Sequence, residues 1–131
     1  MECIIFIGIQ ASGKSTFYKE KFFSTHVRIN LDMLKTRRRE DLFLSASLLA
    51  KQSFVVDNTN PGVEDRKKYI ENAKKSGFKV IAYYFEPDYA ESIRRNERRA
   101  GQAKISEAGI RSVMKKLAFP SRPKALMLFT K

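Results

Sequence analysis

The feature that most constrains the fold of this chain is a loop bounded by two glycines, which begins at Gly8. Its sequence, GIQASGKS, fits the pattern G-x-x-x-x-G-K-[ST] at every fixed position. The apolar run CIIFI precedes it directly, and a helical segment starts near Lys14. Glycines allow the N–H groups of such a loop to point at phosphate oxygens, and the start of the helix adds the positive end of its dipole. The loop therefore predicts a phosphate-binding site between a buried strand and a helix.

The chemistry of this loop predicts a nucleoside triphosphate as its ligand. We expect Lys14 to reach the β and γ phosphates and Ser15 to offer its hydroxyl to Mg²⁺. The residues expected to contact the nucleotide are Gly8, Gln10, Ala11, Ser12, Gly13, Lys14, Ser15 and Thr16. The chain has no N-K-x-D stretch, which guanine-specific proteins with such a phosphate-binding loop usually carry. ATP is therefore the expected nucleotide and Mg²⁺ the expected metal.

Short β-branched or aromatic runs recur along the chain and alternate with segments of helical spacing. The runs at residues 3–7, 27–30, 53–57, 79–85 and 125–129 predict five strands. Such alternation is typical of a parallel α/β sheet. We find no linker or repeat, so we expect one domain over residues 1–131.

Helix boundaries can also be predicted from capping residues. Asn60 is expected to cap a helix whose first residue is Pro61, and Gly77 is expected to follow its end. Ser106 is expected to cap a later helix that runs to about Leu117, and Gly101 to end a helix that starts near residue 89.

Charge and cysteine content limit the partners and the compartment. The 26 Lys and Arg against 14 Asp and Glu give a formal net charge of +12, which favours a polyanionic or phosphate-rich partner over a surface that is basic only for solubility. Cys3 is the only cysteine, and no apolar run approaches the about 20 residues that a membrane span needs. We expect a cytoplasmic protein that does not bind membranes, and no protein partner is evident.

Two carboxylates are expected at the edge of the sheet where the parallel strands end. Asp57 follows the run SFVV, so it is a candidate for the acid that holds Mg²⁺, directly or through water, although it can also form an Asx turn with the residues that follow. Asp32 follows the second run and precedes the basic stretch MLKTRRR. Neighbouring cations favour its ionised form, which suits a group that accepts the proton of an attacking hydroxyl. The alternative role of Asp32 is to cap the helix that follows.

A second basic stretch, RRNERR, begins at Arg94. On a helix, its four arginines fall on one face, where like charges repel unless an anion meets them. Transferring phosphoryl groups are such anions. The alternative is a solvated face that is partly neutralised by Glu97 and Glu91.

Taken together, these segments resemble the P-loop kinases that phosphorylate 5′-hydroxyl ends of DNA or RNA, including the kinase domains of polynucleotide kinase/phosphatases. The resemblance covers most of the chain and rests on the segments GIQASGKST, INLD, VVDNTNP and RRNERRAGQAKISEAGIRSVMKKL. It implies a P-loop NTPase-type three-layer α/β sandwich with a five-stranded parallel sheet of order 2-3-1-4-5 and a helical lid.

The resemblance also implies roles for individual residues. Asp32 matches the general base for the 5′-hydroxyl, and Asp57 matches the acid at the end of the third strand. Arg95 and Arg99 match the lid arginines that clamp the phosphates of ATP and stabilise the transition state. Lys14 and Ser15 keep the roles given above.

One departure concerns the acceptor. Members of the family have arginine three residues past the base, whereas this chain has Lys35, which lacks the bidentate fork. Lys35, Arg37 and Arg38 are the residues expected to bind the phosphates of the acceptor.

The sequence thus predicts an ATP-dependent kinase that acts on a 5′-hydroxyl end of DNA or RNA. Two alternatives stay open. One is a small-molecule P-loop kinase, such as a nucleoside, sugar or antibiotic kinase or a toxin-like kinase of nucleotide sugars. The other is a nucleic-acid-binding ATPase without a hydroxyl acceptor.

Overall fold

The computed structural model describes residues 1–9, 12–85, 94 and 126–129, and its centre is a parallel sheet of order β2-β3-β1-β4-β5. The strands are β1 (Glu2–Ile7), β2 (Val27–Ile29), β3 (Phe54–Val56), β4 (Lys79–Phe85) and β5 (Leu126–Phe129). Every neighbouring pair is parallel. The order of β2, β3, β1 and β4 confirms the predicted arrangement, and β5 pairs with β4 at the edge of the sheet.

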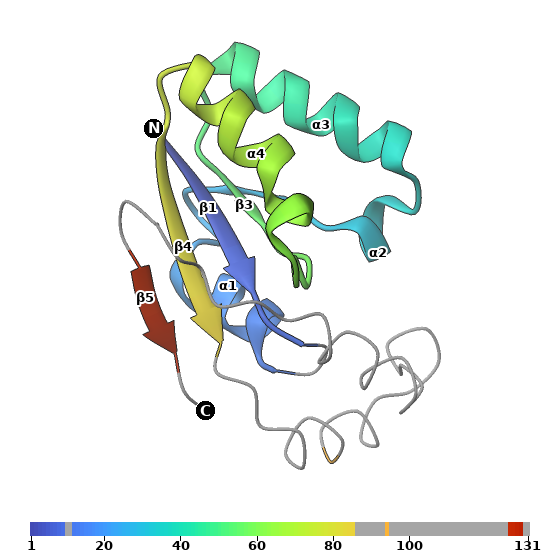
Figure 1. Cartoon of the computed structure of the whole chain (residues 1–131), viewed down its shortest axis with the longest axis vertical. Coiled ribbons are helices and arrows are strands. Elements are labelled where there is room, and N and C mark those ends of the chain that lie inside the picture. Colours follow the sequence, from blue (N-terminus) through green and yellow to red (C-terminus); the bar gives the residue numbers. More distant parts are fainter. Residues whose placement is uncertain (10–11, 86–93, 95–125, 130–131) are drawn as a thin grey trace.

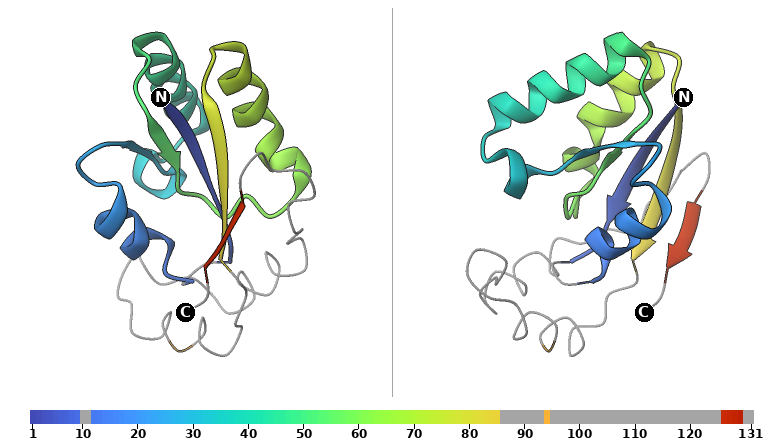
Figure 2. Two further views of the ribbon diagram at one scale, coloured as in Figure 1. Left: turned by 90° about the vertical axis from the view of Figure 1, so that its left-hand side faces the viewer. Right: turned by 180° about the vertical axis from the view of Figure 1, so that it is seen from behind.

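Helices cover both faces of this sheet, which gives three layers (Figures 1 and 2). They are α1 (Lys14–Lys21), α2 (Leu31–Leu34), α3 (Arg37–Ala50) and α4 (Val63–Lys75). α3 and α4 pack on one face, and α1 packs on the other. No helix in the described part of the chain is long and apolar enough to span a membrane.

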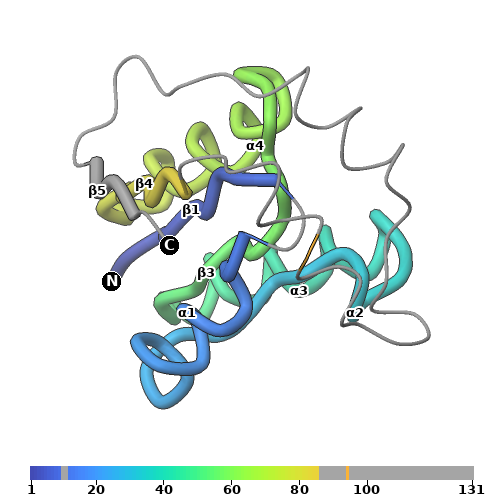
Figure 3. Tube along the Cα trace, turned by 90° about the horizontal axis from the view of Figure 1, so that it is seen from below, coloured from blue at the N-terminus to red at the C-terminus, as the bar shows by residue number. Residues whose placement is uncertain are grey.

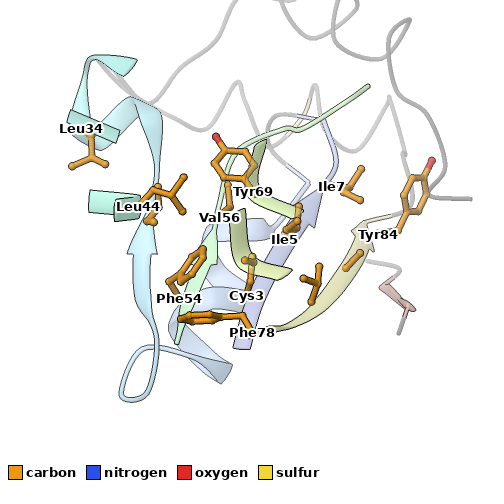
Figure 4. Packing of buried hydrophobic residues seen from close by; sticks show 14 residues of the cluster. Cys3, Ile5, Ile7, Leu34, Leu44, Phe54, Val56, Tyr69, Phe78 and Tyr84 are labelled. Atoms are coloured by element: carbon orange, nitrogen blue, oxygen red, sulfur yellow. The ribbon is translucent and has the colours of Figure 1, made fainter. Parts of the chain in front are cut away.

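Two groups of buried residues hold the layers together, and β1 contributes to both. Cys3, Ile5 and Ile7 belong to the group that includes residues of α3 and α4 (Figure 4), whereas Ile4 and Phe6 belong to the group that includes α1. A central strand that is buried on both faces needs a continuous apolar run, which explains the composition of CIIFI. β1 is therefore fixed from both sides, and so is the start of the loop that follows it.

The amino end of α4 differs from the prediction. The helix begins at Val63 and its N-cap is Gly62, whose N–H donates to Oδ2 of Asp65 at 2.9 Å. Asn60 is not the cap, because its buried side chain turns to the sheet and donates from Nδ2 to the carbonyl of Phe6 at 2.8 Å. That carbonyl lies in β1, where an unpaired polar group would be costly.

The other end of α4 agrees with the prediction. Gly77 follows the helix with φ +81°, and its N–H donates to the carbonyl of Lys74. The two later helices, from about residue 89 and from Ser106, lie outside the described residues, as does Gly101.

Candidate phosphate-transfer site

The glycine-bounded loop leaves the sheet at the edge where the parallel strands end, which is the side viewed in Figure 3. Gly8 donates its N–H to the carbonyl of Thr59 at 3.0 Å. A Cβ on Gly8 would lie 2.9 Å from Cβ of Phe85, so a larger residue does not fit there. Gly13 has φ 97°, in the left-handed region, and directly precedes α1. Both fixed glycines of the motif therefore meet a steric or conformational need.

Lys14 lies at the start of α1 and is folded back into the loop. Its ammonium donates to the carbonyls of Gly8 and Ile9 at 3.1 and 2.7 Å and to Oγ of Ser12 at 3.4 Å, and the residue is only 8% exposed. The structure thus brings together four residues predicted for the loop: Gly8, Ser12, Gly13 and Lys14. Thr16 is exposed on α1, and Gln10 and Ala11 lie outside the described residues. This arrangement places a positive charge between the end of β1 and the start of α1, where the motif predicts phosphate binding.

The two groups predicted to hold Mg²⁺ are in direct contact. Oγ of Ser15 donates to Oδ2 of Asp57 at 3.1 Å, and Asp57 is 1% exposed directly after β3. Within the described residues, no cluster of three or more His, Cys, Asp or Glu side chains could hold a metal. Mg²⁺ is usually bound by one or two protein oxygens together with phosphate oxygens and water. A hydroxyl and a carboxylate at this separation fit that coordination.

Arg28 also belongs to this site, although the sequence interpretation missed it. Its Nε donates to Oδ2 of Asp57 at 2.9 Å and its Nη2 donates to Oγ of Ser15 at 3.0 Å. The guanidinium therefore bridges both groups and lies 6.0 Å from the ring centroid of Tyr18. The available signal was a charged residue inside a strand: Arg28 is the register partner of Val55, which lies two residues before Asp57 and so on the same face.

Asp32 lies in the first turn of α2 with an exposed side chain. It is not the cap of this helix, so the alternative role given above is wrong. Asn30 is the N-cap, and its side chain accepts a hydrogen bond from the N–H of Met33 at 2.9 Å. The reason is that β2 ends at Ile29, which leaves Asn30 in the extended conformation that a cap needs.

Two asparagines connect α2 to the end of β3. Asn30 donates from Nδ2 to the backbone carbonyl of Asp57, and Oδ1 of Asn58 accepts from the N–H of Leu31 at 2.9 Å. The helix that carries Asp32 is thus attached to the segment that carries Asp57. These hydrogen bonds therefore fix the backbone beside Asp32 relative to the backbone at Asp57.

The predicted acceptor-binding cations lie at the turn between α2 and α3. Lys35 is exposed and ends α2 with φ 78°, and Arg38 is exposed in the first turn of α3. Arg37 donates from Nη1 to Oε1 of Glu40 at 2.9 Å. Thr36 caps α3 by accepting from the N–H of Arg39 at 3.1 Å, which fixes the start of this basic turn. The predicted lid arginines, Arg95 and Arg99, lie outside the described residues.

Comparison with known proteins identifies a matching family and a related protein. Residues 31–120 match the model of a family described as "AAA domain". A bifunctional polynucleotide phosphatase/kinase of Schizosaccharomyces pombe is 35% identical over 75 residues, which cover 56% of this chain and 18% of that protein. The chain thus spans less than a fifth of the length of this relative.

Solved structures show the same fold at low sequence identity. Chaetomium thermophilum Kti12 in complex with ADP-AlF3 matches with TM-score 0.71 at 17% identity, over 98% of this chain and 88% of that one. A gluconokinase from Sinorhizobium meliloti 1021 matches with TM-score 0.68 at 16% identity, over 98% of this chain and 82% of that one. The chain therefore belongs to the AAA domain family and has the fold of the P-loop kinases.

Proposed function

We propose that this chain is an ATP-dependent kinase that transfers the γ-phosphate to a 5′-hydroxyl end of DNA or RNA. The observation that carries the proposal is the position of Asp32. Asp32 follows Leu31, whose N–H is bound by Asn58, and Asn58 directly follows Asp57. Because β1, β3 and β2 are parallel, the helix that follows β2 starts at the same edge of the sheet as the phosphate loop. A carboxylate at this edge is suited to accept a proton from a substrate.

The proposed reaction divides the work among the described residues. Lys14 and the loop backbone bind the phosphates of ATP, and Ser15 and Asp57 hold Mg²⁺. When bound, Mg²⁺ neutralises negative charge that develops on the phosphates. Asp32 orients the acceptor hydroxyl and accepts its proton as the new oxygen–phosphorus bond forms. The bond between the γ phosphorus and the β–γ bridging oxygen breaks, and ADP leaves with that oxygen.

A nucleic acid is the proposed acceptor because of the charge around Asp32 and the likeness to the polynucleotide phosphatase/kinase. Lys35 and Arg38 are exposed next to the helix that carries Asp32, and the whole chain has a net charge of +12. Contacts to backbone phosphates give affinity that falls steeply with salt and depends little on base sequence. A small hydroxyl substrate does not need this surface.

A small-molecule kinase is the second candidate, and Lys35 is the observation that favours it. Lysine cannot form the two parallel hydrogen bonds that arginine makes to a phosphate. Lysine at position 35, where members of the polynucleotide kinase family have arginine, therefore weakens the argument that the acceptor carries a phosphate bound at this position.

Incubation with ATP labelled at the γ-phosphate and Mg²⁺ tests the two candidates together. The acceptors are 5′-hydroxyl DNA, 5′-hydroxyl RNA, the same oligonucleotides with a 5′-phosphate as the matched control, and a panel of sugars and nucleosides. We expect label only on the 5′-hydroxyl oligonucleotides. Label on a sugar or a nucleoside alone would replace the proposal with the second candidate.

A further inference from the structure

A buried carboxylate that the proposed reaction does not use lies beside α2. Glu40 on α3 is 0% exposed and accepts hydrogen bonds at both oxygens. Its Oε1 accepts from Nη1 of Arg37 at 2.9 Å and from Nζ of Lys68 at 3.3 Å, and its Oε2 accepts from Nδ2 of Asn58 at 2.9 Å. The two cations come from α3 and α4, whereas Asn58 comes from the loop after β3.

The contact with Asn58 sets the orientation of its amide group. An asparagine amide has a donor end and an acceptor end, so fixing one end fixes the other. Because Nδ2 of Asn58 donates to Glu40 at 2.9 Å, and at the longer distance of 3.5 Å to Oη of Tyr69, Oδ1 is left to accept the N–H of Leu31 at 2.9 Å. This N–H belongs to the first residue of α2, one of the N–H groups that a helix cannot satisfy internally.

We propose that Glu40 and Asn58 are positioning residues for phosphoryl transfer, which hold the helix carrying Asp32 through the hydrogen-bond chain from Glu40 to Asn58 to the N–H of Leu31. The inference rests on the proposed role of Asp32. Misplacing a reacting group by about 1 Å can lower a rate roughly 100-fold, so loss of these hydrogen bonds is expected to lower the rate of transfer through the position of Asp32.

Glu40 is suited to this role because it stays ionised. Burial by itself would raise the pKa of Glu40, but hydrogen bonds from Asn58, Tyr69 and Arg37 outweigh it and hold the pKa below its usual range. An ionised carboxylate is an acceptor at both oxygens, so it never competes with Asn58 for the donor role.

Substitution can reverse the direction of the hydrogen bond between Glu40 and Asn58, so that position 40 donates and position 58 accepts. In Glu40→Gln, the new amide keeps an oxygen for Arg37 and Lys68 and turns its NH₂ group to Nδ2 of Asn58, so two donors face each other. In Asn58→Asp, two carboxylates face each other. In the double variant, the NH₂ introduced at position 40 donates to the carboxylate introduced at position 58, which still accepts from the N–H of Leu31. The double variant has the same formal charge as wild type. Its hydrogen bonds from position 40 through position 58 to the N–H of Leu31 are restored, with donor and acceptor exchanged between positions 40 and 58.

The experiment compares the two single variants, the double variant and the control Asp41→Asn. Asp41 also accepts from Lys68, at 2.9 Å, but it is exposed and does not take part in the hydrogen bonds that join Glu40, Asn58 and Leu31. For each protein we would measure kcat for transfer to a 5′-hydroxyl oligonucleotide, the Kd for ATP and the hydrogen-exchange rate of the Leu31 amide. We expect each single variant to lose about tenfold or more in kcat, with a Kd for ATP within about twofold of wild type. The double variant and Asp41→Asn are expected to remain near wild type.

The exchange rate separates this inference from the proposed function. The Leu31 amide is expected to exchange at least about tenfold faster in Glu40→Gln than in wild type and to recover in the double variant. Unchanged exchange in Glu40→Gln, or kcat in the double variant no higher than in the single variants, would overturn the positioning role. Absence of transfer by wild type would instead overturn the proposed function. The exchange rates would still decide whether the hydrogen bonds from Glu40 through Asn58 to Leu31 hold α2 in place.

Discussion

Arg28 and Asp57 form an ion pair at the edge of the sheet, with Nε of Arg28 2.9 Å from Oδ2 of Asp57. Asp57 is almost fully buried, and the side chain of Arg28 is 27% exposed. Because a buried carboxylate is costly without a counter-charge, Arg28 stabilises the acid that we propose as a magnesium ligand. The same guanidinium donates to Ser15, so one residue orients both proposed ligands.

Substitution of Arg28 tests this relationship. Arg28→Met should lower the free energy of unfolding by about 1–3 kcal/mol, because it leaves the buried carboxylate of Asp57 without its counter-charge, although Ser15 still donates to it. Addition of Asp57→Asn should recover part of this loss, since the uncompensated charge is then removed. Chemical denaturation in the absence of Mg²⁺ measures all three proteins, and Arg38→Met, at an exposed arginine, is the control. A loss in Arg28→Met no larger than in Arg38→Met would show that the pair is not stabilising.

Lys14 is expected to be essential for nucleotide binding. Lys14→Met should weaken ATP binding roughly 10- to 100-fold, because each hydrogen bond to a charged group contributes about 1.5–3 kcal/mol. Lys19→Met, which removes an exposed lysine in the last turn of the same helix, should bind as wild type does. Isothermal titration calorimetry with ATP compares the two variants. Equal affinities in both would mean that Lys14 does not reach the phosphates.

Gly8 is expected to tolerate no side chain. Gly8→Ala places a methyl group 2.9 Å from Cβ of Phe85 and 3.1 Å from Oγ of Ser12, and overpacking of this kind costs about 1–3 kcal/mol. Gly62→Ala is the matched control, since the nearest atom there is a carboxylate oxygen of Asp65, at the end of a flexible side chain. Thermal unfolding should show the larger decrease in Tm for Gly8→Ala. Similar values of Tm for the two variants would indicate that the loop has room beside β4.

Glu40 should make the stability of the protein depend on pH in the acidic range. Its pKa is lowered in the folded state, so its stabilising effect is complete above the ordinary pKa of glutamate, about 4.3, and is lost as pH falls through the lower folded value. Glu40→Gln should therefore be less stable than wild type at neutral pH, and the difference should shrink below about pH 4. Urea unfolding across this range measures the effect, with Glu71→Gln at an exposed site of α4 as control. A constant difference between wild type and Glu40→Gln at every pH would contradict this explanation.

Much of the fold could be predicted from local sequence patterns, because its strands are short apolar runs separated by segments with the spacing of helices. The bounds of β4 agree with the predicted run at residues 79–85, and β1 differs from its run by one residue. Loops were harder to predict, since an asparagine can cap a helix, as Asn30 does, or bind a distant carbonyl, as Asn60 does. Only the tertiary structure decides between these uses.

The candidate site was predictable where a motif fixes the spacing of its residues and not where residues meet across the fold. The contact between Ser15 and Asp57 follows from the loop and from the edge of the sheet, and both are visible in the sequence. Arg28 and Glu40 take part through contacts with residues 29 and 18 positions away, which no local pattern contains. Charged residues of this kind are recognised only when their partners across the fold are known.

The central claim is that Asp32 is the base for transfer to a 5′-hydroxyl end, and its direct test is a single-turnover measurement with labelled ATP and Mg²⁺. Wild type, Asp32→Asn and the control Asp41→Asn would each be given 5′-hydroxyl DNA and RNA at saturating ATP. We predict transfer by wild type and Asp41→Asn and a rate at least about 100-fold lower in Asp32→Asn, with unchanged ATP affinity. Transfer by Asp32→Asn at the rate of wild type would contradict the account.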